Sequence, residues 1–395
     1  MNSYPSKKEI ERRVERLCSH MQQNGIDAFY VVSPANIAYL TGFYHLPTER
    51  PIAAVILASG EKILIVPKLE LDHAERYSYA DKVLSYDEYP GETHPMLIIS
   101  SYLKGLNLEG KVIAFDGDGH PHVHGYRGPR LSEVFNARYR YERDLIERMR
   151  MTKSDEEIAL LRESGKWTAL GLRLLQAYVE SGMFEDEVSL KASLEASAIM
   201  AKTLKGVYEP RSRYSGVWAF FRGQVGIHSF YPHSLPSYSV IKKGDVLIGE
   251  AFAPVAGYSA ELERTIIVGK PTPEQEKFFK LMVEARRVAL ERIKSGVKCS
   301  DIDKAVRSFF KENDLMKYWR HHTGHGIGLE GHEMPFFDIG DVTILEEGMV
   351  MSVEPGIYVE KVGGFRHSDT IVVTKDGYEL ITRYPEELEE LIVEV

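Results

Sequence analysis

The sequence predicts an α+β protein of two domains, a smaller α/β domain over residues 1–145 and a larger one over residues 146–395. First, 395 residues are too many for one ordinary domain. Second, short β-branched runs dominate the first part, whereas long amphipathic helices accompany strand-like runs in the second. Third, the composition changes near residues 142–152, so the boundary is placed there.

The first domain opens with a helix and continues with short buried strands. Ser6 precedes Glu9 by three residues, which is the pattern of a capped helix start. The apolar residues that follow recur at helical spacing: Ile10, Val14, Leu17 and Met21. Strands are expected at 27–33, 51–58, 62–67 and 111–116, with 59–61 forming a hairpin turn.

The second domain begins with a long helix. Ser154 is a helix cap followed by acidic residues, and the helix is expected to continue to about Glu180. Further helices are expected at 185–204, 273–295 and 300–312, and strands at 245–253, 262–268, 348–353 and 369–373. This order fits helices packed outside a curved antiparallel sheet.

Composition excludes several functional classes. Hydrophobic residues make up 44% and charged residues 27% of the chain, as in soluble globular proteins. The net charge of −9 argues against a nucleic-acid surface. Cys18 and Cys299 alone cannot form a disulfide scaffold or a zinc–cysteine site, and no apolar run predicts a signal peptide or membrane span. We therefore expect a cytoplasmic protein.

Two motifs carry the chemistry. His325 lies between glycines in Thr323-Gly324-His325-Gly326, and Glu354 lies between a hydrophobic strand and Pro355-Gly356. Both side chains are expected to face a cavity. The motifs resemble those of the pita-bread hydrolases, which include prolidase, aminopeptidase P, methionine aminopeptidase and creatinase. The resemblance implies a creatinase-type N-terminal α/β domain, a pita-bread catalytic domain, and a homodimer with a first-domain loop near the neighbour's active site.

In the two-metal members of that family, two aspartates, one histidine and two glutamates hold a pair of divalent cations. Matching the motifs residue by residue places Glu250 and Glu261 at the aspartate positions and leaves His325 and Glu354 intact. The fifth position, between an arginine and an aspartate, is held by Ser368.

These departures make an ordinary dinuclear centre unexpected. Glutamate extends one methylene further than aspartate, and serine is a neutral, poor ligand for a hard dication. Our leading expectation is therefore a site without metal, most similar to the metal-independent creatinase-like and ectoine hydrolase-like members. The alternative is one or two divalent ions (Mn, Co or Zn) held by Glu250, Glu261, His325 and Glu354.

Without metal, the carboxylates of Glu250, Glu261, Glu263 and Glu354 would repel one another and favour a cation among them. A guanidinium or amidinium head of a substrate could satisfy them bidentately. Resemblance to creatinase marks Glu263 as the guanidinium-binding position. The alternative is that Glu263 pairs with a nearby arginine or lysine.

Three further histidines are assigned roles through the resemblance. His233 is in register with the acid/base histidine of creatinase, and an imidazole can take and return a proton near neutral pH. His332 matches a histidine that contacts substrate or intermediate, and it is expected to stabilise the tetrahedral intermediate together with His325. His367 takes the place of a substrate-binding glutamate of creatinase, which makes creatine a poor guess. Alternatively, His233 is an ordinary loop residue and His332 only anchors its loop.

Two arginines are candidates for binding a substrate carboxylate. Arg222 lies in an aromatic run before the catalytic stretch, and Arg50 lies in the first-domain loop that the family dimer would bring to the neighbour's site.

The sequence leaves three alternative hypotheses for the function. The leading hypothesis is a hydrolase cleaving a C–N bond of a small zwitterionic amidine- or guanidine-like metabolite, with ectoine fitting better than creatine and His233 as the acid/base. The alternative is a metal-dependent Xaa-Pro dipeptidase or aminopeptidase, with Glu354 as proton shuttle. A non-catalytic binding module is the third, and His233 disfavours it.

Overall fold

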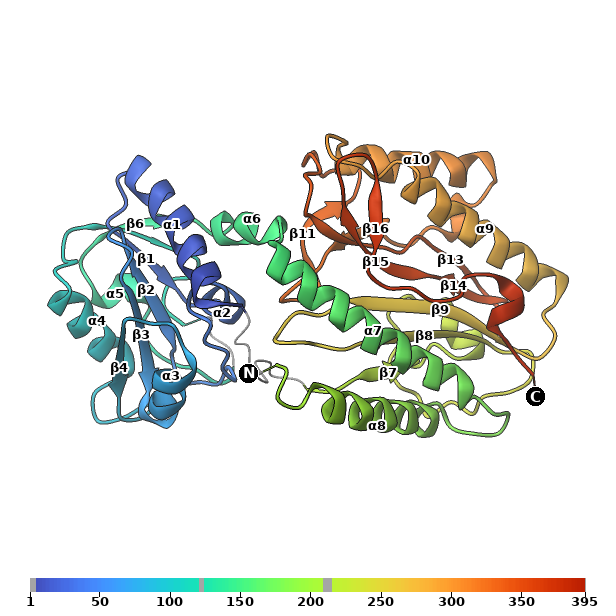
Figure 1. The fold of residues 1–395 in the computed structure, drawn as a ribbon, viewed down its shortest axis with the longest axis horizontal. Coiled ribbons are helices and arrows are strands. Elements are labelled where there is room, and N and C mark those ends of the chain that lie inside the picture. Colours follow the sequence, from blue (N-terminus) through green and yellow to red (C-terminus); the bar gives the residue numbers. More distant parts are fainter. Residues whose placement is uncertain (1–4, 121–123, 209–214, 395) are drawn as a thin grey trace. The chain divides into compact units, whose positions relative to one another are not determined.

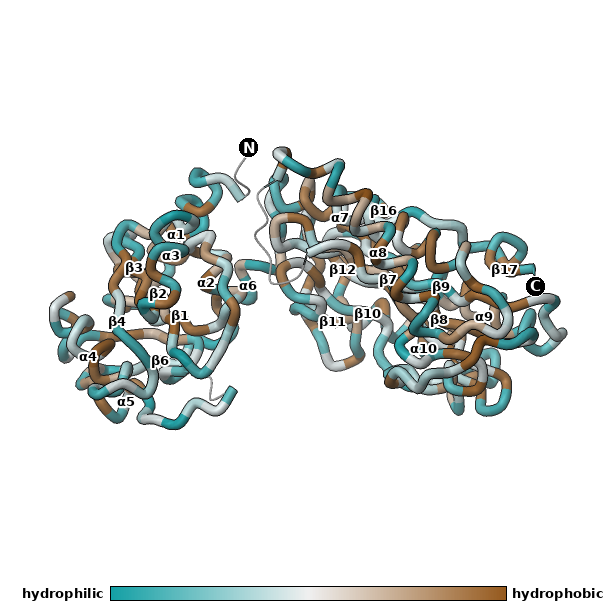
Figure 2. Tube along the Cα trace, turned by 90° about the horizontal axis from the view of Figure 1, so that it is seen from below, coloured by the Kyte–Doolittle hydropathy of each residue, from teal (hydrophilic) through white to brown (hydrophobic). Residues whose placement is uncertain are grey.

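The computed structural model describes residues 5–120, 124–208 and 215–394. The chain divides into two compact units, whose main segments are Asn2–Arg150 in one and Met151–Pro210 with Tyr214–Val395 in the other. In each unit, hydrophobic segments follow the buried strands, as seen for β2 and β3 (Figure 2).

The first unit is a six-stranded sheet in the order β4-β3-β2-β1-β5-β6 (Figure 1). Its strands are β1 (Ala28–Val31), β2 (Ala53–Leu57), β3 (Lys62–Pro67), β4 (Lys82–Tyr86), β5 (Val112–Phe115) and β6 (Arg138–Tyr141). The β1–β2 and β2–β3 pairs are antiparallel, and the β1–β5, β3–β4 and β5–β6 pairs are parallel. The helices are α1 (Lys7–Gln23), α2 (Pro34–Thr41), α3 (Leu71–Tyr77), α4 (Pro95–Gly105), α5 (Leu131–Val134) and α6 (Leu145–Met151).

The predicted cap of α1 is confirmed. The Ser6 hydroxyl accepts a hydrogen bond of 3.2 Å from the backbone N–H of Glu9. One turn further, the buried Arg13 donates to Glu9 and to the carbonyl oxygen of Tyr39 in α2. The first helix is thereby fixed to the second.

The second unit contains a nine-stranded sheet, with the main order β11-β10-β12-β15-β9-β8-β7. Its strands are β7 (Trp218–Phe220), β8 (Val246–Phe252), β9 (Glu261–Val268), β10 (Gly324–Gly326), β11 (Glu333–Phe337), β12 (Val350–Val353), β15 (Ser368–Val373), β16 (Tyr378–Leu380) and β17 (Ile392–Val393). A separate hairpin joins β13 (Gly356–Val359) to β14 (Gly363–Arg366). All strand pairs of the larger sheet are antiparallel except β17 with β9.

Four long helices accompany this sheet: α7 (Asp155–Ala177), α8 (Glu185–Leu204), α9 (Pro273–Leu290) and α10 (Cys299–Glu312). Helix α7 crosses β8 and β9 in Figure 1, and α8 runs beside β7. Ser154 and Glu157 form a reciprocal capping box at the start of α7, so the predicted helix start is confirmed.

The packing of α7 on β8 decides which way the next side chain points. A Cβ on Gly249 would lie 3.0 Å from Leu175 and 3.1 Å from Leu172 of α7, so glycine permits the close approach. Successive strand residues face opposite sides of a sheet. Because Gly249 faces α7, Glu250 faces the other side, where the functional residues gather.

Candidate active site

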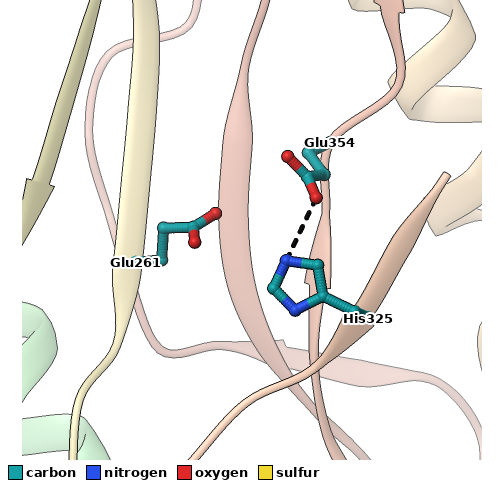
Figure 3. Close-up of side chains that lie close together, drawn as sticks. All are labelled: Glu261, His325 and Glu354. Atoms are coloured by element: carbon teal, nitrogen blue, oxygen red, sulfur yellow. Dashed lines mark ion pairs between the residues drawn. The ribbon is translucent and has the colours of Figure 1, made fainter. Parts of the chain in front are cut away.

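Glu261, His325 and Glu354 converge on the face of the sheet opposite α7. They come from β9, β10 and the residue after β12, and Figure 3 shows their side chains pointing toward one another. One ligand atom from each lies within 4.8 Å of the others. Two carboxylates and one imidazole form a donor set that suits Mn²⁺, Co²⁺ or Zn²⁺. The described residues therefore fit a single divalent metal.

His325 is held in one orientation by its neighbours. Its Nδ1 lies 3.0 Å from the carbonyl oxygen of Gly326, which can only accept, so Nδ1 carries the proton. Its Nε2 lies 3.1 Å from Oε1 of Glu354 and is the atom available to a metal. Gly324 is required beside it, since a Cβ there would lie 2.1 Å from the carbonyl oxygen of Ser352.

The His325–Glu354 pair is charged when no metal is bound. Burial disfavours the imidazolium, but the hydrogen bond and charge of Glu354 outweigh burial and raise the pKa of His325 to about 9. Burial would raise the pKa of Glu354 in turn, yet His325 holds it well below its usual range. A proton on Nε2 thus takes the place of a metal ion.

Glu261 receives a hydrogen bond from the serine at the altered fifth position. The Ser368 hydroxyl donates to Oε1 of Glu261 at 2.7 Å. Burial, followed by the charge of Glu354, raises the pKa of Glu261 to about 8. The charge of His325 acts in the opposite direction but does not outweigh these two effects, whereas a bound divalent metal would favour the ionised carboxylate.

Glu263 is engaged by an arginine. It lies on β9 directly opposite Glu250 of β8, and Arg366 contacts both of its carboxylate oxygens. The alternative that Glu263 pairs with a nearby arginine is confirmed. Arg366 also donates to the Tyr358 hydroxyl at 3.0 Å, so the pair lies within a wider network.

Glu250 lies outside the three-residue cluster and faces a second arginine. Nη1 of Arg222 is 3.3 Å from Oε2 of Glu250. Burial, with the charge of Glu263, raises the pKa of Glu250 to about 7 despite this arginine. The predicted role of Arg222 in binding a substrate carboxylate stays a prediction.

His332 lies against His325. The two rings are stacked with centroids 3.8 Å apart and an angle of 18° between their planes. Partial burial and the charge of His325 lower the pKa of His332 to about 4, so its ring is neutral at pH 7. The neighbouring Glu333 anchors the loop through a buried ion pair with Lys153 at 3.1 Å, a contact that motif matching missed.

His233 lies in the exposed loop that follows the short helix η2 (Gly226–Phe230). Its pKa is lowered by partial burial and then by the charges of Arg222 and Arg366, while Glu354 and Glu263 act in the opposite direction. The lowered pKa favours the neutral form of the His233 ring at pH 7.

Glu185 fixes the loop that carries Arg222 and His233. Its buried carboxylate accepts backbone hydrogen bonds from Gly223 at 2.7 Å, Ser237 at 2.9 Å and Ser239 at 3.2 Å. Both ends of the loop are thereby joined to the start of α8. Sequence reasoning missed Glu185, because an acidic residue in a first helical turn is ordinary and its burial is visible only in the tertiary structure.

His367 is not brought to the site, which corrects the expectation that it binds substrate. Arg366 and Ser368 face the cluster, so the alternation of an extended chain turns His367 to the opposite face. There it is fully buried with its ring 5.2 Å from that of Phe279 in α9. Within the described part of the chain, neither ring nitrogen has a hydrogen-bond partner.

Arg50 belongs to the first unit and forms ion pairs with Glu49 and, at 2.7 Å, with Glu88. Its predicted place at a dimer interface stays a prediction. In the residues that the structure describes, no helix is both long and apolar enough to span a bilayer.

Comparison with known proteins identifies the family. Residues 159–375 match the model of metallopeptidase family M24, and residues 13–152 match the creatinase/prolidase N-terminal domain. The putative dipeptidase YkvY of Bacillus subtilis is 29% identical over 95% of this chain and 99% of its own length.

Solved structures of similar proteins support the same family. The Xaa-Pro dipeptidase from Bacillus anthracis has a TM-score of 0.81 at 26% identity, covering 97% of this chain and 100% of that one. Dipeptidase PepE from Mycobacterium ulcerans has a TM-score of 0.83 at 26% identity and full coverage of both chains. The predicted fold, a creatinase-type domain followed by a pita-bread catalytic domain, is confirmed. The chain therefore belongs to metallopeptidase family M24.

Proposed function

We propose that this protein is a metal-dependent peptidase that hydrolyses the peptide bond of Xaa-Pro dipeptides. The observation that carries the proposal is the convergence of Glu261, His325 and Glu354 on one point. The Xaa-Pro substrate class comes from the solved relatives, one of which is described as an Xaa-Pro dipeptidase.

The three side chains would hold one divalent ion. Such an ion would supply Lewis acidity and lower the pKa of a water molecule bound to it. Neighbouring groups of the chain orient the three side chains that would bind the ion. Nδ1 of His325 donates to the carbonyl oxygen of Gly326, which leaves Nε2 as the atom that would bind the ion, while the Ser368 hydroxyl orients Glu261. Glu354 is ionised and serves as a ligand without needing to lose a proton.

Two neutral imidazoles are placed to handle protons and developing charge. His332 is stacked on His325 and is neutral, so its ring can donate a hydrogen bond to the oxygen of a tetrahedral intermediate. His233 is neutral and exposed on its loop, so it can first take a proton from the attacking water and then deliver that proton to the leaving nitrogen.

The amidine or guanidine hydrolase expected from the sequence has less support. That hypothesis needs free carboxylates to hold a cationic substrate head. Both oxygens of Glu263 contact Arg366, and Glu250 faces Arg222. Two of the four carboxylates are thus already paired with internal cations, and the relatives reported above are described as dipeptidases.

The test is hydrolysis of Ala-Pro, ectoine and creatine by protein stripped with EDTA, with and without added MnCl₂. We expect proline release that requires Mn²⁺ and is abolished by Glu261→Gln or His325→Ala. Glu274→Gln, which changes an exposed residue of α9, is the matched control and should retain activity. Chelator-resistant cleavage of ectoine or creatine, without cleavage of Ala-Pro, would reject the proposal in favour of the amidine or guanidine hydrolase.

A further inference from the structure

The number of metal ions can be inferred from the charges around the site. This inference rests on the proposed metal site at Glu261, His325 and Glu354. Glu250 and Glu263 occupy directly opposite positions of β8 and β9. Like charges in that relation are unfavourable, and burial increases the cost, so each carboxylate needs its own cation.

Each of these two carboxylates is paired with an arginine. Arg366 contacts both oxygens of Glu263, and both side chains are buried. Glu250 faces Arg222, whose Nη1 lies 3.3 Å from Oε2. Within the described residues, neither Oε2 of Glu250 nor Nε of Arg222 has a hydrogen-bond partner, so the ion pair is the main polar contact for this oxygen.

The backbone conformation at Arg222 directs its side chain toward Glu250. Arg222 follows β7 and adopts a φ of 51°, a left-handed conformation that is uncommon for a residue with a side chain. The next residue, Gly223, donates its N–H to Glu185 at 2.7 Å, which fixes the chain at this point. A maintained backbone strain of this kind points to a functional role for the side chain it directs.

With these two pairs neutral, Glu261 and Glu354 leave two negative charges, and one divalent ion with neutral His325 balances them. A second divalent ion would leave two excess positive charges in a buried site, which is unfavourable. Ser368 brings no charge to offset them, because its hydroxyl is neutral and donates to Glu261.

We propose that the guanidinium of Arg222 acts as a built-in cation for Glu250, in the place where a second metal ion would otherwise be needed, and limits the site to one divalent ion. Arg222 is then a determinant of metal stoichiometry.

The experiment counts Mn²⁺ bound to metal-stripped protein by equilibrium dialysis with elemental analysis. Electron paramagnetic resonance adds a second readout, because an isolated Mn²⁺ ion differs from an exchange-coupled pair. We expect one ion per chain in the wild type and in Arg222→Lys, which keeps the charge. The control Arg292→Met changes an exposed arginine after α9 and should also bind one.

The double variant Arg222→Met, Ser368→Glu removes the internal cation and adds a carboxylate, so we expect two ions with a coupled signal. Two ions in the wild type, or one in a folded double variant, would overturn the inference while leaving the metal site intact. No bound ion in the wild type would overturn the proposed metal site itself. The wild-type count requires no variant, so it tests the inference even if the double variant does not fold.

Discussion

Ser368 donates a hydrogen bond of 2.7 Å to Glu261, joining a residue of β15 to a proposed metal ligand on β9. A side chain that orients a metal ligand contributes to affinity without touching the metal. The serine at the altered fifth position therefore retains a function, even though it supplies no charge.

Replacing that serine tests this relationship. Ser368→Ala removes the donor and should weaken Mn²⁺ binding roughly 10-fold to 100-fold, which is the usual effect of losing a partner of a metal ligand. Isothermal titration calorimetry measures the change. Ser308→Ala, at an exposed position of α10, is the control. An unchanged dissociation constant would show that Ser368 does not orient Glu261.

The buried pair of Glu263 and Arg366 should matter strongly for stability. Arg366→Met leaves an unpaired carboxylate in the protein interior, which typically costs about 3–5 kcal/mol of unfolding free energy. Adding Glu263→Gln removes the unpaired negative charge and should recover part of the lost unfolding free energy. Urea unfolding of the metal-free protein provides the comparison. A cost below about 1 kcal/mol, as for an exposed pair, would contradict the buried geometry.

Glu185 should act on catalysis as a positioning residue. Glu185→Gln weakens the anchoring of the loop that carries Arg222 and His233, so we expect kcat to fall roughly 10-fold to 100-fold through misplacement of the loop. The pH profile should change as well, while bound Mn²⁺ stays the same. The exposed Glu187→Gln on the same helix is the control. Equal effects in both variants would reject the role.

The metal-free protein should lose stability as the pH rises. The pKa of His325 is raised to about 9, that of Glu261 to about 8 and that of Glu250 to about 7. A group with a raised pKa binds its proton more tightly in the folded state, so its stabilisation is complete below its unfolded pKa and is lost as pH passes the folded one.

Thermal melts of the metal-free protein between pH 5 and pH 9 should therefore show a falling Tm over the range spanned by these three values. Added Mn²⁺ should oppose the fall, since it binds the deprotonated ligands. His325→Gln should weaken the dependence at the alkaline end. The lowered pKa of His332 acts in the opposite direction only below the unfolded histidine pKa, so a Tm that rises between pH 7 and pH 9 without metal would contradict these shifts.

Much of the second unit was predictable from pattern. Helix α8 covers Glu185–Leu204 as expected, and β9 begins at Glu261, one residue before the predicted strand. The short strands β10 and β14 were not predicted, because their glycine-rich sequences lack the apolar alternation that marks a strand.

The part of the site that was predictable consists of the residues whose positions follow directly from the sequence motifs. Glu261, His325 and Glu354 meet because each lies in a strand or directly after one, at a position that the motifs fix. Arg222 and Glu185 act through tertiary contacts, which no local pattern reveals. The prediction for His367 was wrong for a different reason. Side chains alternate between the two faces along an extended chain, so His367 cannot face the cluster when Arg366 and Ser368 do. Matching the motif by position did not account for this alternation.

The most direct test of the central claim is a titration of Mn²⁺ into metal-stripped protein while proline release from Ala-Pro is followed. The proposed site predicts no activity without metal and a rise to a plateau at one Mn²⁺ per chain, lost in Glu261→Gln. Proline release that is unaffected by chelator, or that is absent at every Mn²⁺ concentration, would contradict a metal-dependent Xaa-Pro peptidase built on Glu261, His325 and Glu354.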